Sequence, residues 1–171
     1  MKSVLLSIRP EWCDLIIQHK KTVELRKTRP NLQTPFKVYI WCTKARKFWC
    51  RVHGNGWQQL DERVIGEFVC DDIRRIGPEY CVVKEDIESA IYGSCLTAPQ
   101  VKNYAGWKSG MSYAELKDLY GWHISDLKIY DEPVKLKNFR VKRPDRNCNG
   151  LRDVCNPPQS WIYLEEPEVQ R

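Results

Sequence analysis

The sequence contains no long apolar run, and this absence limits the kinds of protein it can be. A helix needs about 20 consecutive apolar residues to cross a bilayer, and no stretch of the 171 residues approaches that length. The first ten residues contain a lysine and a short apolar stretch, but they lack the longer apolar region and the small-residue cleavage site of a signal peptide. We therefore expect a cytoplasmic protein with no membrane partner.

Patterns typical of metal sites and disulfide frameworks are also missing. None of the eight cysteines stands in a Cys-x-x-Cys motif, and the three histidines form no His-x-x-x-His pair, so the spacing of a zinc site is absent, including around Cys148 and Cys155. Disulfide frameworks belong to short secreted chains. We expect free thiols, with Cys13, Cys42 and Cys70 acting as small hydrophobic residues. No metal and no cofactor is expected.

Acidic residues are absent from one long early segment. No Asp or Glu lies between Leu25 and Leu60, whereas the charge is reversed over residues 61–88 and basic again over residues 135–152. The alternation indicates either a polarised surface that follows phosphates or a plain solvated surface. The early basic block contains Arg26, Lys27, Arg29, Lys37, Lys44, Arg46, Lys47 and Arg51.

The overall composition indicates one folded domain spanning residues 1–171. Hydrophobic residues make up 42% of the chain and aromatic residues 11%, and no internal repeat is present. Periodicity and turn residues predict strands at residues 3–8, 36–42, 64–73, 122–130 and 161–165. They predict helices at residues 10–18 and 84–92, from Thr97, and from a capping box at Ser112 and Glu115 to a stop at Gly121. Gly66 is expected to mark a bulge or a close approach.

One short stretch, residues 7–29, combines a helix start, a helix end and a charged strand. After the helix the pattern changes to period two, so that two apolar residues point one way while Thr22, Glu24 and Arg26 point the other. This polar face is either a solvated surface with a weak Glu24–Arg26 pair or the lining of a pocket. In the second case Lys21, in the preceding turn, contributes to the same pocket.

Two motifs carry a resemblance to a known family. Ser7–Pro10 (SIRP), followed by a helix and then Lys21–Arg26 (KTVELR), is similar to the signature of the ASCH domain family of the PUA-like superfamily. Tyr120–Leu127 (YGWHISDL) resembles the larger bacterial and phage-type members, so the resemblance spans most of the chain. It implies an α+β fold, a PUA-like mixed β-barrel with flanking helices.

The resemblance also implies that the Lys/Glu/Arg signature lies in a cleft that binds RNA or a nucleotide. We expect this cleft to be cationic and its partner to be RNA, other single-stranded nucleic acid or a modified nucleoside. There Lys21 and Arg26 would hold a phosphate or polarise a carbonyl, and Glu24 would accept a hydrogen bond from a base edge or act as a base. Trp122 or Trp49 would stack on the ligand, and His123 is either a structural histidine or a titratable group of the cleft. The further ligand-binding candidates are Arg9, Thr22, Trp122, His123 and Ser125.

A second candidate nucleic-acid surface lies between Thr43 and Glu62. Basic and aromatic residues interleave there, and residues 53–56 (HGNG) supply a turn. This mixture is typical of surfaces that bind single strands through phosphate attraction and base stacking; a plain hairpin covering the barrel is the alternative. The candidate residues are Lys44, Arg46, Lys47, Trp49 and Arg51.

An enzyme is the rival interpretation. Small members of the superfamily remove the acetyl group of N4-acetylcytidine with a Lys, a Thr three residues later and a separate Glu, and Lys21 matches the first of these. Glu24 occupies the second position and Thr22 is displaced, so Glu24 would have to act through a water molecule while Lys21 stabilises the developing oxyanion. Other relatives are regarded as ribonucleases, and a protein-interaction module in transcription or translation is a third hypothesis. The oligomeric state is left open.

Overall fold

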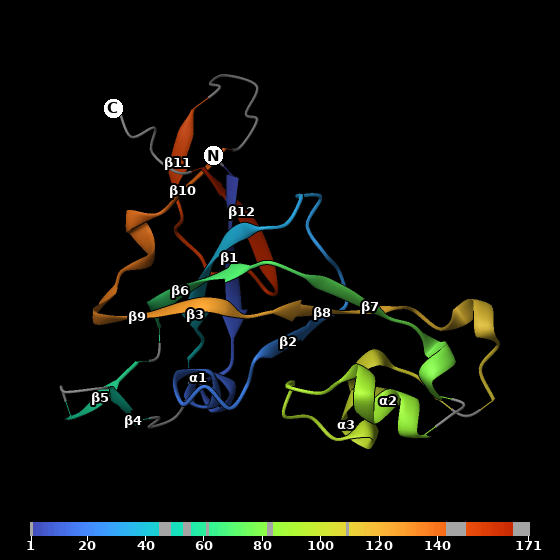
Figure 1. Ribbon diagram of the computed structural model, residues 1–171. Helices are drawn as coiled ribbons and strands as arrows, with labels where there is room; N and C mark the ends of the chain where they lie inside the picture. The colour runs from blue at the N-terminus through green and yellow to red at the C-terminus, as the bar shows by residue number, and fades with distance from the viewer. Residues whose placement is uncertain are drawn as a thin grey trace.

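The computed structural model describes residues 2–44, 49–52, 56–60, 62–81, 84–108, 110–142 and 150–165. It has a mixed α+β fold, dominated in this part of the chain by strands, with a few short helices (Figure 1). The strands are β1 (Lys2–Ile8), β2 (Val23–Arg26), β3 (Phe36–Cys42), β4 (Trp49–Val52), β5 (Gly56–Gln59), β6 (Arg63–Cys70), β7 (Ile73–Ile76), β8 (Leu119–His123), β9 (Ser125–Val134), β10 (Arg140–Lys142), β11 (Leu151–Asp153) and β12 (Trp161–Glu165). The α-helices are α1 (Pro10–Ile17), α2 (Lys84–Ala90) and α3 (Ala98–Ala105), and the 3₁₀ turns are η1 (Pro78–Cys81), η2 (Tyr113–Glu115) and η3 (Leu136–Asn138).

The largest sheet has five strands in the order β12-β1-β3-β6-β9. β1 and β3 are parallel, which requires a crossover connection, and α1 and β2 provide it. The remaining neighbours pair antiparallel. Most residues of β1 and β3 are buried, which explains why both segments read as nearly continuous apolar runs.

A second sheet contains three antiparallel strands in the order β2-β8-β7, and α2 and α3 lie on the same side of the molecule as this sheet (Figure 1). One of its faces forms an apolar cluster with the two helices. That cluster includes Leu25, Ile76, Ile87, Val101 and Leu119. The other face of β8 contributes Trp122 to the main core, where its ring meets Phe36 edge-on at a centroid distance of 5.8 Å.

Two hairpins complete the fold, β4 with β5 and β10 with β11. The predicted strands at residues 3–8, 36–42 and 161–165 and the predicted helix at residues 10–18 are confirmed to within one residue. The prediction of helices starting at residues 84 and 98 is also correct, and Thr97 and Gln100 form a capping box at the second. In the described part of the chain, no helix has the length and apolarity needed to cross a membrane.

The predicted closed β-barrel is wrong for the described strands, because their sheets stay open, with β12 and β9 at the edges of the largest one. Two expected long strands are each divided between the sheets. β6 ends at Cys70 and the chain continues as β7, while β8 ends at His123 and the chain continues as β9. The two strands change sheets at neighbouring points, because Val69 still pairs with Ser125 in the large sheet while Ile73 pairs with Trp122 in the small one. Asp126, next to this point, has a positive φ of 46°.

The predicted helix from the capping box at Ser112 and Glu115 to Gly121 is also wrong. The Ser112 amide donates to the Glu115 carboxylate at 2.8 Å, as in a capping box, but the segment forms only the short turn η2. Leu119 instead pairs with Ile76 as the first residue of β8 and is fully buried. Tertiary pairing has overridden the local helix signal.

Gly66 has the close-approach role that its position in a strand predicts. A Cβ at this position would collide with the backbone carbonyl of Lys128 on β9. The β6–β9 register also shifts between Val64 and Gly66, as expected of an irregular strand.

Candidate functional site

Lys21 is almost completely buried and fully engaged. Its Nζ donates to the backbone carbonyls of Val23, at 2.9 Å, and Ser94, at 2.7 Å, and lies 3.2 Å from Oε2 of Glu24. The ammonium also lies 5.2 Å from the centroid of the Trp12 ring. A lysine has three N–H donors, and here three protein acceptors are available to take them.

Glu24 and Arg26 extend this arrangement along β2. Nη2 of Arg26 lies 2.9 Å from Oε1 of Glu24 and also donates to the Ser7 carbonyl at the end of β1. Glu24 therefore binds Lys21 with one oxygen and Arg26 with the other. We call Lys21, Glu24 and Arg26 the charge cluster; with two cations and one anion it carries a net charge of +1.

The position of Lys21 depends on a tight contact between two loops. The Thr22 and Val23 amides both donate to the Gly93 carbonyl, and the amide of Lys21 donates to the carbonyl of Leu15 in α1. Gly93 has a φ of 81°, and a Cβ there would collide with the Thr22 hydroxyl, so only glycine fits without strain. This contact places the Ser94 carbonyl against the ammonium.

The predicted convergence of Lys21, Glu24 and Arg26 is confirmed, but a solvent-accessible cleft between them is not. Their exposed fractions are only 2%, 6% and 8%. The alternative of a solvated strand face is wrong for the same reason. One donor of the cluster, Nε of Arg26, is buried and has no hydrogen-bond partner among the described residues.

Residues 26–29 carry positive charge from the buried cluster to the surface. Lys27 Nζ lies 5.2 Å from the ring centroid of Tyr104 in α3, and Arg29 Cζ lies 5.9 Å from the ring centroid of Tyr120 in β8. Burial raises the pKa of the Tyr104 phenol, and the nearby Arg26 cation opposes this shift, so the phenol is within electrostatic reach of the cluster. The two tyrosines were not among the predicted site residues.

The other predicted ligand-binding residues are dispersed. Arg9 precedes α1 with a side chain that is 77% exposed. Thr22 acts through its backbone, donating to Gly93 and accepting from the Ile124 amide. Trp122 is wholly buried, so its predicted stacking on a ligand is incompatible with this structure, although its Nε1 has no partner among the described residues.

His123 and Ser125 do not join the charge cluster. In the β2–β8 pairing Trp122 faces Glu24 and His123 faces Val23, and successive side chains point to opposite faces. His123 Nδ1 lies 2.6 Å from Oδ1 of Asp71, and this hydrogen bond lowers the pKa of the Asp71 carboxyl. The Ser125 hydroxyl donates to the Val69 carbonyl at 2.9 Å, which helps to fix the start of β9.

The second predicted surface is described only in part. β4 and β5 pair as the expected hairpin, and Lys44, which precedes it, is exposed and lies 3.9 Å from the Glu62 carboxylate. Arg46 and Lys47 lie outside the described residues, as do the side chains of Trp49 and Arg51. The nucleic-acid role of this segment stays a prediction.

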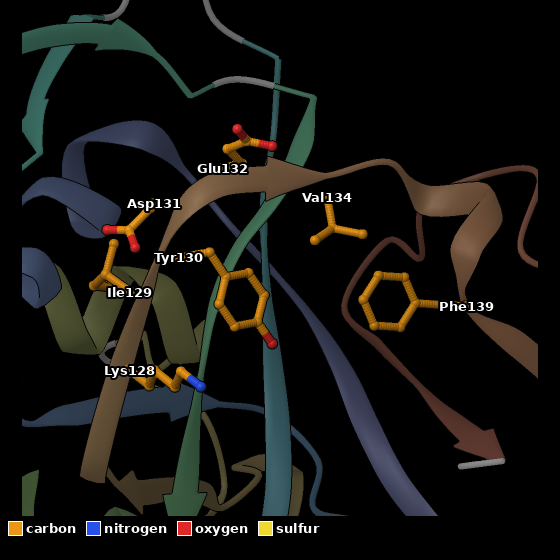
Figure 2. Close-up of a pocket in the computed structure, with 7 residues that line it drawn as sticks. All are labelled: Lys128, Ile129, Tyr130, Asp131, Glu132, Val134 and Phe139. Atoms are coloured by element: carbon orange, nitrogen blue, oxygen red, sulfur yellow. The ribbon is translucent and has the colours of Figure 1, made fainter. Parts of the chain in front are cut away.

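The surface has two pockets of about 560 Å³ each. One is formed by β9 and the segment after it and includes Tyr130, Val134 and Phe139 (Figure 2). The other is formed by residues 88–99, including the exposed Cys95. Neither pocket is lined by a residue of the charge cluster.

The described cysteines are thiols without disulfide bonds: Cys13, Cys42, Cys70, Cys95 and Cys155. The first three are buried, as their apolar surroundings in the sequence predict. Burial raises the pKa of the Cys70 thiol to about 12. Over the described ranges, no group of three His, Cys, Asp or Glu side chains is arranged to hold a metal ion.

An open five-stranded sheet, a second three-stranded sheet and a Lys-Glu-Arg cluster between them define the class of fold. No family model and no curated protein matches the sequence. Among solved structures, the chain is similar to ASCH from Zymomonas mobilis, with a TM-score of 0.60 and 19% identity over 96% of this chain and 88% of that one.

Two single-substitution variants of the Zymomonas mobilis protein are also similar to this chain. Each has a TM-score of 0.60, with 19% and 18% identity over 97% and 96% of this chain and 92% and 89% of theirs. The chain therefore has the ASCH fold, as the two sequence motifs predict. At this level of identity the likeness concerns the fold alone.

Proposed function

We propose that the chain binds RNA or a nucleotide at the face where residues 26–29 leave β2. The observation that carries the proposal is the continuity of this segment. It begins at Arg26, whose Nε is buried without a partner among the described residues, and continues to Lys27 and Arg29 at the surface. Exposed cations attract the phosphate backbone without regard to sequence.

The unpaired Nε of Arg26 supports an oxygen-rich ligand. An unsatisfied buried donor costs about 1–3 kcal/mol, and a phosphate or base oxygen would recover part of that cost if the groups that cover Arg26 moved aside to admit it. Arginine suits this role because its guanidinium presents several donors in one plane. Arg9 adds an exposed cation within electrostatic reach of Tyr104, which is itself close to Arg26.

The carboxylates near this segment have basic partners of their own. Glu24, the acidic member of the cluster, is neutralised by both Lys21 and Arg26. Glu11 lies 3.9 Å from the exposed Arg9 guanidinium, and the Asp71 carboxylate is hydrogen-bonded to His123. Each of these carboxylates thus has a basic partner, whereas Lys27 and Arg29 contact neutral rings and present positive charge to a polyanion.

The test is a binding titration with a fluorescein-labelled RNA of mixed sequence, followed by anisotropy between 50 and 200 mM salt. We expect steep weakening with salt, and a logarithmic slope that is smaller by about 0.7 for each phosphate contact removed. Arg9→Ala and Arg29→Ala should each flatten the slope, whereas Lys137→Ala, an exposed cation on η3, should leave it unchanged. Binding that is insensitive to both arginine variants would contradict the proposal.

The same titration tests the hairpin segment. If Lys44, Arg46 and Lys47 contact phosphates, changing all three to alanine should weaken binding to several RNA sequences alike. An unchanged salt slope would remove this segment from the binding surface.

The hydrolase hypothesis makes different demands on the cluster. Lys21 and Glu24 bind one another in the structure, and the ammonium also binds two backbone carbonyls, so both groups would have to turn toward a substrate. Release of acetate from N4-acetylcytidine, followed by chromatography, tests this hypothesis directly. Acetate release by the wild-type chain that disappears in Glu24→Gln would favour hydrolysis over simple binding.

A further inference from the structure

Two separate elements place a tyrosine ring against the same basic segment. Tyr104 comes from α3 and Tyr120 from β8, and their rings contact Lys27 and Arg29, respectively. Lys27 and Arg29 are two residues apart, so their Cα atoms are at most about 7 Å apart. The two cation-and-ring pairs therefore lie along one short segment of the chain, residues 27–29.

The exposure of the Tyr104 ring leaves room for a second contact. Tyr104 is 37% exposed, which is unusual among the large apolar side chains that the structure describes. Tyr120 is partly buried against the main core. An aromatic ring has two faces, and a cation near one face leaves the other able to stack. A ring beside a cation suits a nucleotide, because the ring stacks on the base while the cation attracts the phosphate.

We propose that the Tyr104–Lys27 and Tyr120–Arg29 pairs are successive stacking positions for single-stranded RNA. This inference rests on the proposed function and specifies its ligand as at least two consecutive unpaired nucleotides. Bases within a duplex are already stacked on one another, so a side-chain ring reaches a base face only in a single strand or a loop. Because every base has such a face, these two positions should tolerate any sequence.

The test compares ring removal with ring retention, using a fluorescein-labelled octauridylate as the probe. Tyr104→Ala should weaken binding at least about fivefold, the loss expected for one stacked base, whereas Tyr104→Phe keeps the ring and should bind within about twofold of the parent. Tyr120→Leu should also weaken binding at least about fivefold, and leucine preserves apolar packing at this partly buried position. Tyr92→Ala is the matched control, because Tyr92 is 84% exposed beyond the end of α2.

A competition experiment tests strandedness. Unlabelled single-stranded RNA should displace the probe, and a blunt duplex of the same length should displace it at least tenfold less well. Circular dichroism of each variant confirms that it is folded before binding is compared.

Several outcomes would overturn the inference. Wild-type affinity in both Tyr104→Ala and Tyr120→Leu, or equal competition by duplex RNA, would show that the rings do not stack on bases. The proposed function would survive either result if binding still weakened with salt and in Arg9→Ala. Absence of any RNA binding by the wild-type chain would reject the proposed function and the inference together.

Discussion

Replacing Lys21 by methionine should strongly destabilise the fold. The change leaves the Val23 and Ser94 carbonyls without their donor and leaves Glu24 with Arg26 as its remaining partner in the cluster. Removing one partner of a buried ion pair costs about 3–5 kcal/mol, and we expect the lower end, about 3 kcal/mol, because Arg26 still neutralises Glu24. For a chain of this size each kcal/mol lowers Tm by about 2–4 °C, which gives a decrease of about 6–12 °C.

The measurement is thermal unfolding followed by far-ultraviolet circular dichroism, with Lys44→Met as the matched control. Lys44 also faces a carboxylate, that of Glu62, but the pair is exposed and its atoms are 3.9 Å apart. Such surface pairs contribute about 0–1 kcal/mol, so the control should unfold close to the wild type. If Lys21→Met and Lys44→Met unfolded at the same temperature, the ammonium would not support the fold as its contacts indicate.

Three further predictions concern other parts of the structure. Gly66→Ala should lower the free energy of unfolding by about 1–3 kcal/mol, measured by urea titration, because its Cβ would meet a backbone carbonyl of β9. Cys70, whose thiol pKa is raised to about 12 by burial, should react with iodoacetamide at pH 8 much more slowly than the exposed Cys95, and equal rates by mass spectrometry would refute this. Because the hydrogen bond from His123 lowers the pKa of Asp71, the pair should add stability above the ordinary aspartate pKa and lose it as the pH falls through the lowered value; His123→Gln should raise the Asp71 pKa in an NMR titration.

Much of the fold could be predicted because its strands and helices have strong local signals. The apolar run of β3 and the proline that begins α1 are decisive without any tertiary information. The segment before β8 could not be predicted, because Ser112 and Glu115 provide the same capping chemistry for a helix and for a short turn. The contact that decides between them is the pairing of Leu119 with Ile76, which lies far away in the sequence.

The candidate site shows the same division. Period two in β2 correctly puts Glu24 and Arg26 on one face, but whether that face is solvated depends on what covers it. The covering groups are the Ser94 carbonyl from the loop after α2 and the Ser7 carbonyl from β1, and no local pattern connects them to β2. Tyr104 could not be predicted as a site residue, because no local pattern connects α3 to β2.

The arrangement of charges separates residues that support the fold from residues that are available to a ligand. The donors of Lys21 are directed at protein acceptors, whereas Lys27 contacts the exposed ring of Tyr104 and Arg29 the partly buried ring of Tyr120. Substitution of Lys21 should therefore change stability first, and any loss of binding or turnover has to be measured well below the Tm of the variant. Substitution of Arg29 should change affinity at constant Tm. A variant that loses affinity while it retains the wild-type Tm is the result that assigns a residue to the ligand, and by this criterion we expect Arg29 to qualify and Lys21 to fail.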